Sequence, residues 1–289
     1  MAYHSPLPRR SHDFFSVDTA ACLSCGACVK DCVGQALTMH DGYPVMLHEE
    51  KCIGCQHCLA VCPVGAVSVL GHTAADCLSL DGVFPHPDSL TALVRGRRSC
   101  RQYRQEDVDR ATLDQLFAAA QYAPTGVNAR KLWVCTLDTL TSLQAFREEV
   151  YARLAELDAA GAIPDDRRAQ VFRAAPRLWR EKQVDVLFRT APHCVIVANA
   201  KDAPCPMQDP IIYLSYFELL AHSWGLGTTW CGLLYWCITL FLPDVMQRLG
   251  MPDGYELSYC MLYGKPAVHY PRSVALPAPD VHRVQWAGR

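Results

Sequence analysis

The spacing of apolar residues predicts helices and strands that mix through most of the chain. Where apolar residues recur every three or four positions, one face of a helix would be buried. This period predicts helices over residues 89–96, 108–120, 140–157 and 211–224. Short, compact apolar runs predict strands over residues 132–137, 193–198 and 254–263. Because both kinds of element occur within residues 91–273, we expect an α+β domain with an internal sheet.

One stretch of this region, residues 219–243, contains no Asp, Glu, Lys or Arg and is long enough for a membrane helix. His222 and the Gly225-Leu226-Gly227 break interrupt it, and no basic cluster flanks it. A helix, a glycine break and a buried strand explain the pattern better. We therefore expect no membrane partner.

The amino-terminal part contains a repeat that is shifted by 30 residues and is clearest in its cysteines. Two runs share the spacing C-x2-C-x2-C-x3-C, namely Cys22, Cys25, Cys28 and Cys32, followed by Cys52, Cys55, Cys58 and Cys62. The similarity continues beyond the cysteines, where Ala36-Leu37-Thr38-Met39 matches Ala66-Val67-Ser68-Val69. We expect a small two-fold domain over residues 14–71, in which each half is a loop, a short helix and a strand. Much of its folding energy would come from what the cysteines bind.

Zinc and iron–sulfur clusters are the two alternatives for so many thiolates. Zinc ribbons use two C-x2-C pairs that lie far apart in the sequence. In each run here, two residues separate each of the first three cysteines and three residues separate the third from the fourth, a spacing that suits a [4Fe–4S] cluster. This half of the chain closely resembles the bacterial two-cluster ferredoxins, although Val33 stands where that family often has proline, as at Pro63. The fourth cysteine of each run binds the other cluster in such ferredoxins. The resemblance therefore implies a first set of ligands, Cys22, Cys25, Cys28 and Cys62, and a second set, Cys52, Cys55, Cys58 and Cys32.

Composition narrows the class of protein further. The chain has 289 residues, of which 51% are hydrophobic and 19% charged, so it can bury a substantial core. A formal net charge of −2 gives no reason to expect nucleic acid as a partner. Sixteen cysteines in so long a chain indicate reduced thiols, and residues 1–15 lack the apolar core of a signal peptide. We expect a cytoplasmic protein with a linker over residues 72–90 and a tail over residues 274–289.

Two further segments carry groups suited to a ligand. The first has three guanidinium groups and a hydroxyl within five residues: Arg97, Arg98, Ser99 and Arg101. Because arginine offers planar paired donors, this segment is suited to hold a phosphate. The second combines small residues, which let a flat ligand approach the backbone, with an amide that donates and accepts: Pro124, Thr125, Gly126 and Asn128. Taken singly, the first segment could be a solvated basic turn and the second an ordinary turn.

The two segments are followed by Gly-Leu-Gly-x-x-Trp at residues 225–230 and by a terminal Gly-x-Pro. With its motifs in this order, the chain resembles the FMN-dependent nitroreductase family over residues 91–273. The resemblance implies a sandwich with a central sheet flanked by helices, and a homodimer with FMN at the subunit interface. It implies that Arg97, Arg98, Ser99 and Arg101 hold the FMN phosphate and ribityl chain, completed by Lys265 and Arg272. It places Asn128 and its neighbours at the isoalloxazine, with Cys231 and Gly232 beside flavin N5. Arg130 and Lys131 stand where the family often has Gln-Pro, and either cation could reach N1/O2 or remain on the surface.

The two resemblances together predict an FMN-dependent oxidoreductase with iron–sulfur input. Two [4Fe–4S] clusters would carry single electrons to FMN, which would reduce a nitroaromatic, a quinone or an activated alkene. Chemistry would be centred on FMN, with no catalytic side chain required. The electron donor could be a ferredoxin, a hydrogenase or NAD(P)H. Alternatives are a dehalogenase, a flavin-destroying synthase, or an electron-transfer or redox-sensing module that serves a protein partner.

Overall fold

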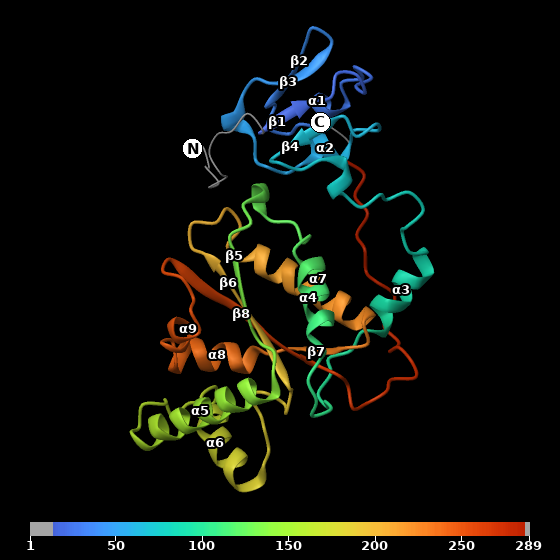
Figure 1. Cartoon of the computed structure of the whole chain (residues 1–289). Coiled ribbons are helices and arrows are strands. Elements are labelled where there is room, and N and C mark those ends of the chain that lie inside the picture. Colours follow the sequence, from blue (N-terminus) through green and yellow to red (C-terminus); the bar gives the residue numbers. More distant parts are fainter. Residues whose placement is uncertain (1–13, 287–289) are drawn as a thin grey trace.

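The computed structural model describes residues 14–286 and shows a small region above a larger one (Figure 1). Residues 1–13, which bear on the expected absence of a signal peptide, and the last three residues of the expected tail lie outside the described part of the chain. The small region contains the elements β1 (Phe15–Val17), α1 (Ala27–Lys30), β2 (Leu37–His40), β3 (Tyr43–Met46), α2 (His57–Ala60) and β4 (Val67–Val69).

The repeat is visible in the small region as two matching halves, each with a one-turn helix followed by a strand. Strand β1 pairs with β4 and β2 with β3, both antiparallel. Between β2 and β3, Asp41 and Gly42 both adopt left-handed backbone angles. A two-residue hairpin turn of type I′ requires that conformation at both central positions, and Asp-Gly is among the sequences that favour it.

The larger region is an α+β fold that follows the expected order of elements. It contains α3 (Pro87–Gly96), α4 (Arg110–Ala120), β5 (Leu132–Leu137), α5 (Leu140–Ala159), α6 (Gln170–Lys182), β6 (His193–Ala200), α7 (Gln208–Ser223), β7 (Gly227–Trp230), α8 (Gly232–Phe241), α9 (Val245–Arg248) and β8 (Tyr255–Gly264). Single 3₁₀ turns lie at Glu49–Lys51, Ala74–Asp76 and Gly126–Asn128. The pattern of apolar residues did not predict α6 or α8. The charge-free stretch consists of the end of α7, strand β7 and helix α8, as three separate elements.

Four antiparallel strands in the order β5-β6-β8-β7 form the central sheet. Strand β6 is buried along its whole length, and its side chains alternate between two cores. Cys194 and Ile196 face a core built with α5, α6 and α8, whereas Val195 and Val197 face one built with α4 and α7. The expected α+β sandwich, with a central sheet flanked by helices, is confirmed (Figure 1).

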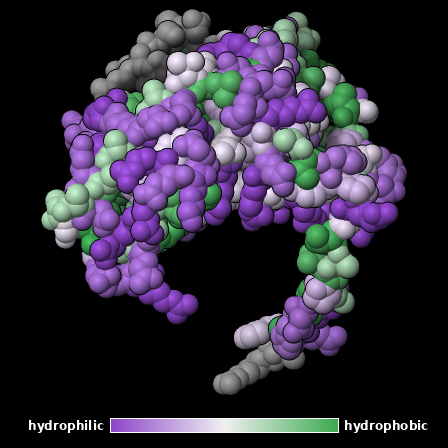
Figure 2. All heavy atoms as spheres, turned by 90° about the horizontal axis from the view of Figure 1, so that it is seen from below, coloured by the Kyte–Doolittle hydropathy of each residue, from purple (hydrophilic) through white to green (hydrophobic). Residues whose placement is uncertain are grey.

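The surface seen from below is mostly hydrophilic and is hollowed between two projecting arms (Figure 2). Residues 274–286 form no regular secondary structure and are exposed throughout. Within residues 14–286, no helix combines the length and the apolar character needed to cross a membrane.

A buried ion pair fixes the loop before β6. Arg147 on α5 contacts Asp185 with 2.9 Å between Nε and Oδ2, and both side chains are almost fully buried. Asp185 also accepts hydrogen bonds from the Tyr151 hydroxyl at 2.7 Å and from the Phe188 and Thr190 amides at 2.8 and 2.9 Å. The carboxylate is therefore fully partnered, as a buried charge must be if the fold is to tolerate it.

Replacing Asp185 by alanine should destabilise the protein strongly, because it would leave Arg147 buried and uncompensated. We expect a loss of about 3–5 kcal/mol in the free energy of unfolding, measured by urea denaturation followed by tryptophan fluorescence. The control is Asp244→Ala, which removes a solvent-exposed pair with Arg153 and should lose about 0–1 kcal/mol. Equal losses in the two variants would contradict this prediction.

Candidate functional site

The eight cysteines of the repeat surround two small cavities in the amino-terminal region. One cavity is lined by Cys22, Cys25, Cys28 and Cys62. The other is lined by Cys52, Cys55, Cys58 and Cys32. We call these the first and the second cluster site. The structure thus brings together the same two groups of four that the ferredoxin resemblance implies, although their role as ligands stays a prediction.

Left-handed residues before the short helices allow each loop to turn around its cavity. Gly26 precedes α1 with φ of 70°, and Gln56 precedes α2 with φ of 59°. Backbone amides also point at the sulfurs, since Ala36 donates to Cys32 and Ala66 donates to Cys62, at 3.3 and 3.2 Å. Such bonds stabilise a negatively charged sulfur.

The thiols are difficult to ionise without a cation in the cavity. Burial, with a smaller contribution from the neighbouring Cys52, Cys55 and Cys32 thiols, raises the pKa of Cys58 to about 11. In the first site, burial also raises the pKa of Cys28, with Cys62 and Cys25 adding to the effect. Iron in the cavity would supply the missing positive charge and release the protons. Within residues 14–286, no three Cys, His, Asp or Glu side chains converge as one metal ion would require. The arrangement of four sulfurs around a cavity fits a [4Fe–4S] cluster.

The 97–101 segment lies along strand β7 as an added extended piece. Cys100 donates its amide to the Thr228 carbonyl at 2.8 Å, and its side chain is buried against Gly227. A Cβ on Gly227 would come within 2.5 Å of Cys100 Cβ, so glycine is needed for this close approach. Because side chains alternate along an extended segment, Ser99 and Arg101 lie on the side opposite Cys100.

The three arginines of this segment have different surroundings. Arg97 forms an ion pair with Glu218 on α7, with 3.1 Å between Nη1 and Oε1. The Arg98 guanidinium donates to the Arg95 carbonyl, and its buried Nε has no hydrogen-bond partner within residues 14–286. Arg101 is exposed. An unpartnered buried donor beside an exposed arginine fits a phosphate or ribityl oxygen, whereas Arg97 already has its counter-charge.

Lys265 lies beside this segment, but nothing places Arg272 there. The Lys265 carbonyl accepts a hydrogen bond from the Arg104 amide at 2.9 Å, so β8 ends beside residues 102–104, which directly follow the 97–101 segment. The Lys265 ammonium is 3.4 Å from Glu106 Oε1, and both side chains are half exposed. Arg272 is exposed, and no hydrogen bond or ion pair joins it to residues 14–286.

The 123–130 segment lies at the beginning of α7. Gly126 donates its amide to Asp209 Oδ1 at 2.9 Å, and a Cβ on Gly126 would come within 2.6 Å of Cys205 Sγ. Val127, Asn128 and Arg130 all adopt left-handed backbone angles, although none is glycine. Each such residue costs on the order of 1 kcal/mol or more, and this kind of strain is concentrated at functional sites.

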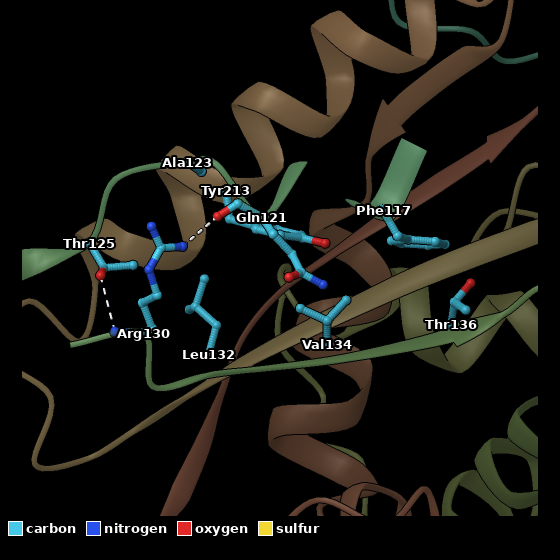
Figure 3. A pocket seen from close by; sticks show the side chains of 9 residues that line it. All are labelled: Phe117, Gln121, Ala123, Thr125, Arg130, Leu132, Val134, Thr136 and Tyr213. Atoms are coloured by element: carbon cyan, nitrogen blue, oxygen red, sulfur yellow. Dashed lines mark hydrogen bonds between the residues drawn. The ribbon is translucent and has the colours of Figure 1, made fainter. Parts of the chain in front are cut away.

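A cavity of about 410 Å³ lies between this segment, the end of α4, strand β5 and α7 (Figure 3). Its volume is within the range of small-ligand and cofactor sites. It is lined by Phe117, Gln121, Ala123, Thr125, Arg130, Leu132, Val134, Thr136 and Tyr213. Arg130 is held at its edge by two hydrogen bonds that Figure 3 shows, from its amide to Thr125 Oγ1 at 3.1 Å and from Nη1 to the Gln121 carbonyl at 2.6 Å.

Asn128 makes a contact that joins the two regions of the chain. Its Nδ2 donates to the carbonyl oxygen of Ile53 at 3.0 Å. Ile53 lies between Cys52 and Cys55, and it lines the second cluster site. The 3₁₀ turn that carries Asn128 is the part of the larger region that points toward the small one in Figure 1.

Cys231 and Gly232 stand at the start of helix α8, directly after β7, whereas the 410 Å³ cavity is lined by β5 at the opposite edge of the sheet. Cys231 donates its thiol to the Leu187 carbonyl at 2.9 Å, and burial raises the pKa of this thiol to about 11. It is therefore a neutral, buried group that fixes the loop before β6. A Cβ on Gly232 would lie 3.0 Å from the Tyr259 hydroxyl, so a larger residue here would require a small shift of the Tyr259 side chain.

Sequence reasoning missed three residues that organise these segments: Glu218, Asp209 and Ile53. Glu218 is the single acid within the apolar 211–224 helix, and that isolation was a usable signal. Asp209 is buried, with Oδ2 unpartnered within residues 14–286, and no motif marked it. Ile53 acts through its backbone, which leaves no trace in the sequence. Lys131, one of two cations considered for the flavin, instead pairs with Asp202 at 2.8 Å.

Comparison with known proteins agrees with this division. Residues 16–69 match the 4Fe-4S dicluster domain, and residues 94–265 match the nitroreductase family. The chain is 37% identical over 75 residues to a ferredoxin of Pyrobaculum islandicum, a match covering 26% of this chain and 70% of that protein. It is 35% identical over 88 residues to 5,6-dimethylbenzimidazole synthase of Rhodobacter capsulatus, covering 30% of this chain and only 41% of the synthase.

Solved structures show the same fold for the larger region. A nitroreductase with bound FMN from Bacteroides fragilis superposes with a TM-score of 0.55 at 20% identity, covering 68% of this chain and 98% of that one. A second, from Desulfitobacterium hafniense, gives 0.52 at 23% identity, with the same coverage. Since the family match spans more than half of its residues, the chain belongs to the nitroreductase family, and a 4Fe-4S dicluster domain precedes its nitroreductase domain.

Proposed function

We propose that the chain is an FMN-dependent oxidoreductase that takes single electrons through two [4Fe–4S] clusters and delivers electron pairs to a small acceptor. The acceptor would be a nitroaromatic, a quinone or an activated alkene. The observation that carries the proposal is the hydrogen bond from Asn128 to Ile53, because it connects the segment expected at the flavin with a cluster-binding loop. FMN, when bound, supplies the conversion between one-electron and two-electron chemistry.

The positions of the two ligand-binding segments support FMN as the cofactor. The 123–130 segment is attached to α7 at Asp209, and the 97–101 segment is attached to it at Glu218. Nine residues separate these attachment points, which corresponds to about 14 Å along a helix. An elongated ligand with a phosphate at one end and a flat ring at the other matches that separation. The nitroreductases from Bacteroides fragilis and Desulfitobacterium hafniense were solved with bound FMN.

The chain's own residues would hold and orient this cofactor. Arg98 and Arg101 would donate to the phosphate, with Lys265 nearby, while Arg97 fixes the segment to α7 through Glu218. Arg130 would present a positive charge at the edge of the 410 Å³ cavity, which favours an anionic reduced ring. The electron donor would be a ferredoxin, a hydrogenase or NAD(P)H. A second copy of the chain would complete the site as a homodimer.

Cofactor content tests the proposal most directly. Protein reconstituted anaerobically with iron, sulfide and FMN should hold about eight iron and eight sulfide atoms per chain, as two [4Fe–4S] clusters require, together with one FMN. Chemical analysis for iron and labile sulfide and extraction of the flavin provide the counts. Zinc without labile sulfide, or protein that retains no FMN, would refute the proposal.

Substitution of Arg101 tests the phosphate end of the flavin site. Arg101→Ala should weaken FMN binding about 10- to 100-fold, the effect of losing a charged hydrogen bond, because the phosphate would lose a donor. Riboflavin, which lacks the phosphate, should bind both proteins equally, as measured by fluorescence titration. Arg104→Ala is the matched control, since Arg104 is exposed and lies 3.9 Å from Glu106. An equal loss of riboflavin affinity would argue for a general structural defect.

A second candidate function comes from the identity to 5,6-dimethylbenzimidazole synthase. In that case the reduced protein would consume its own flavin in air. Chromatography of reduced, FMN-loaded protein after exposure to oxygen should then show 5,6-dimethylbenzimidazole in stoichiometric yield. Intact FMN after reoxidation, with turnover of a nitroaromatic or a quinone, is what the first function predicts.

A further inference from the structure

We infer that the second cluster site is the one that passes electrons to the flavin, and that the first is the one that receives them from outside. This inference rests on the proposed function, which requires only that clusters feed FMN and leaves their order open. It adds a role for Asn128 as a positioning residue that holds the second cluster loop against the flavin-binding segment.

The bond between Asn128 and Ile53 has a chemically fixed orientation. Arg130 Nε donates to Asn128 Oδ1 at 2.9 Å. A guanidinium group can only donate, so the amide oxygen must face Arg130 and the NH₂ group must face the Ile53 carbonyl. The left-handed backbone at Asn128 and Arg130 holds both side chains in this arrangement.

A short bonded route therefore leads from the second cluster site to the cavity. It starts at the Cys52 sulfur, follows the backbone to the Ile53 carbonyl, and crosses one hydrogen bond to Asn128. From there a second hydrogen bond reaches Arg130, which lines the 410 Å³ cavity. No comparable contact leaves the first site: within residues 14–286, no hydrogen bond joins residues 22–28 to the nitroreductase domain.

The internal repeat makes the difference between the sites measurable, because Leu23 is the counterpart of Ile53. Leu23, Ser24 and Cys25 are all exposed, and Leu23 is 63% exposed. Their counterparts Ile53, Gly54 and Cys55 are half-buried or buried. The two loops correspond in the repeat, but the first is exposed and the second is partly buried. The exposed loop around the first site is free to meet an external one-electron donor, whereas the second loop faces the nitroreductase domain.

The electron balance follows from this order. A low-potential one-electron donor reduces the first cluster, which reduces the second. Each transfer at the flavin would oxidise the second cluster by one electron, and two such transfers with one proton from solvent would convert FMN to the anionic reduced form that Arg130 favours. Each donor molecule gives up one electron, so two donor molecules are oxidised for each FMN that is reduced.

The test uses Cys25→Ala and Cys55→Ala, which are equivalent positions of the repeat in the two sites. Each full-length variant is reconstituted anaerobically, its iron, sulfide and FMN are counted, and it is mixed rapidly with reduced methyl viologen while the flavin absorbance is followed. The double variant gives the rate of direct flavin reduction by the dye. We expect Cys55→Ala to fall to that baseline, because the second cluster is the last step before the flavin. Cys25→Ala should fall between the baseline and the unmodified protein, because it lacks the exposed entry site but the small dye can still reduce the second cluster directly.

The outcomes separate this inference from the proposed function. If Cys55→Ala stays above the baseline while Cys25→Ala falls to it, or if both stay equally above it, the assigned order is wrong and the proposed function remains. If the unmodified protein itself does not exceed the baseline, the proposed function fails and the inference fails with it.

Asn128→Ala provides a measurement that does not depend on assembling a damaged cluster. Loss of one hydrogen bond should speed amide exchange in residues 52–55 about fivefold, with residues 22–25 unchanged. At saturating FMN and unchanged iron and sulfide content, the rate of cluster-dependent flavin reduction should also fall. Unchanged exchange at residues 52–55, or an unchanged rate, would overturn the role given to Asn128.

Discussion

The hydrogen bond between the Asn128 amide and the Ile53 carbonyl connects the small region with the larger one, and the proposed electron path depends on it. Every other element can be understood within its own region: strand pairs hold the small region, and two cores cover the sheet of the larger one. Among the hydrogen bonds of residues 14–286, this is the one that connects a loop of the second cluster site with a segment of the predicted flavin site. A redox chain needs such closeness, because electrons cross only short gaps between cofactors.

The backbone around Asn128 is strained, and this strain is the conformational cost of placing the Asn128 amide. Three non-glycine residues within four positions, Val127, Asn128 and Arg130, adopt left-handed backbone angles, which are strained unless neighbours fix them. The neighbours are present: Asp209 accepts from Gly126, Thr125 accepts from Arg130, and Cys205 packs against Gly126. The segment is therefore held from the α7 side, which leaves the Asn128 side chain free to reach outward.

Sequence reasoning predicted much of the fold because the responsible signals are local. The eight cysteines have a spacing that few sites share, and the helices and strands of the sheet have clear periods. It could not predict that Arg97 would pair with Glu218, because that contact joins residues 121 positions apart. Nor could it find Ile53, because the hydrogen bond uses the backbone carbonyl of this position, which every residue type has. Tertiary contacts made by the backbone leave no residue preference to detect.

The most informative property of the repeat is consequently the way its symmetry is broken. Two halves of nearly the same sequence pattern build two cavities, each lined by four cysteines. Placing the nitroreductase domain against Ile53 and leaving Leu23 exposed makes the sites different without changing a single cysteine. The order of the two clusters in the electron path would thus arise from the packing of one domain on the other.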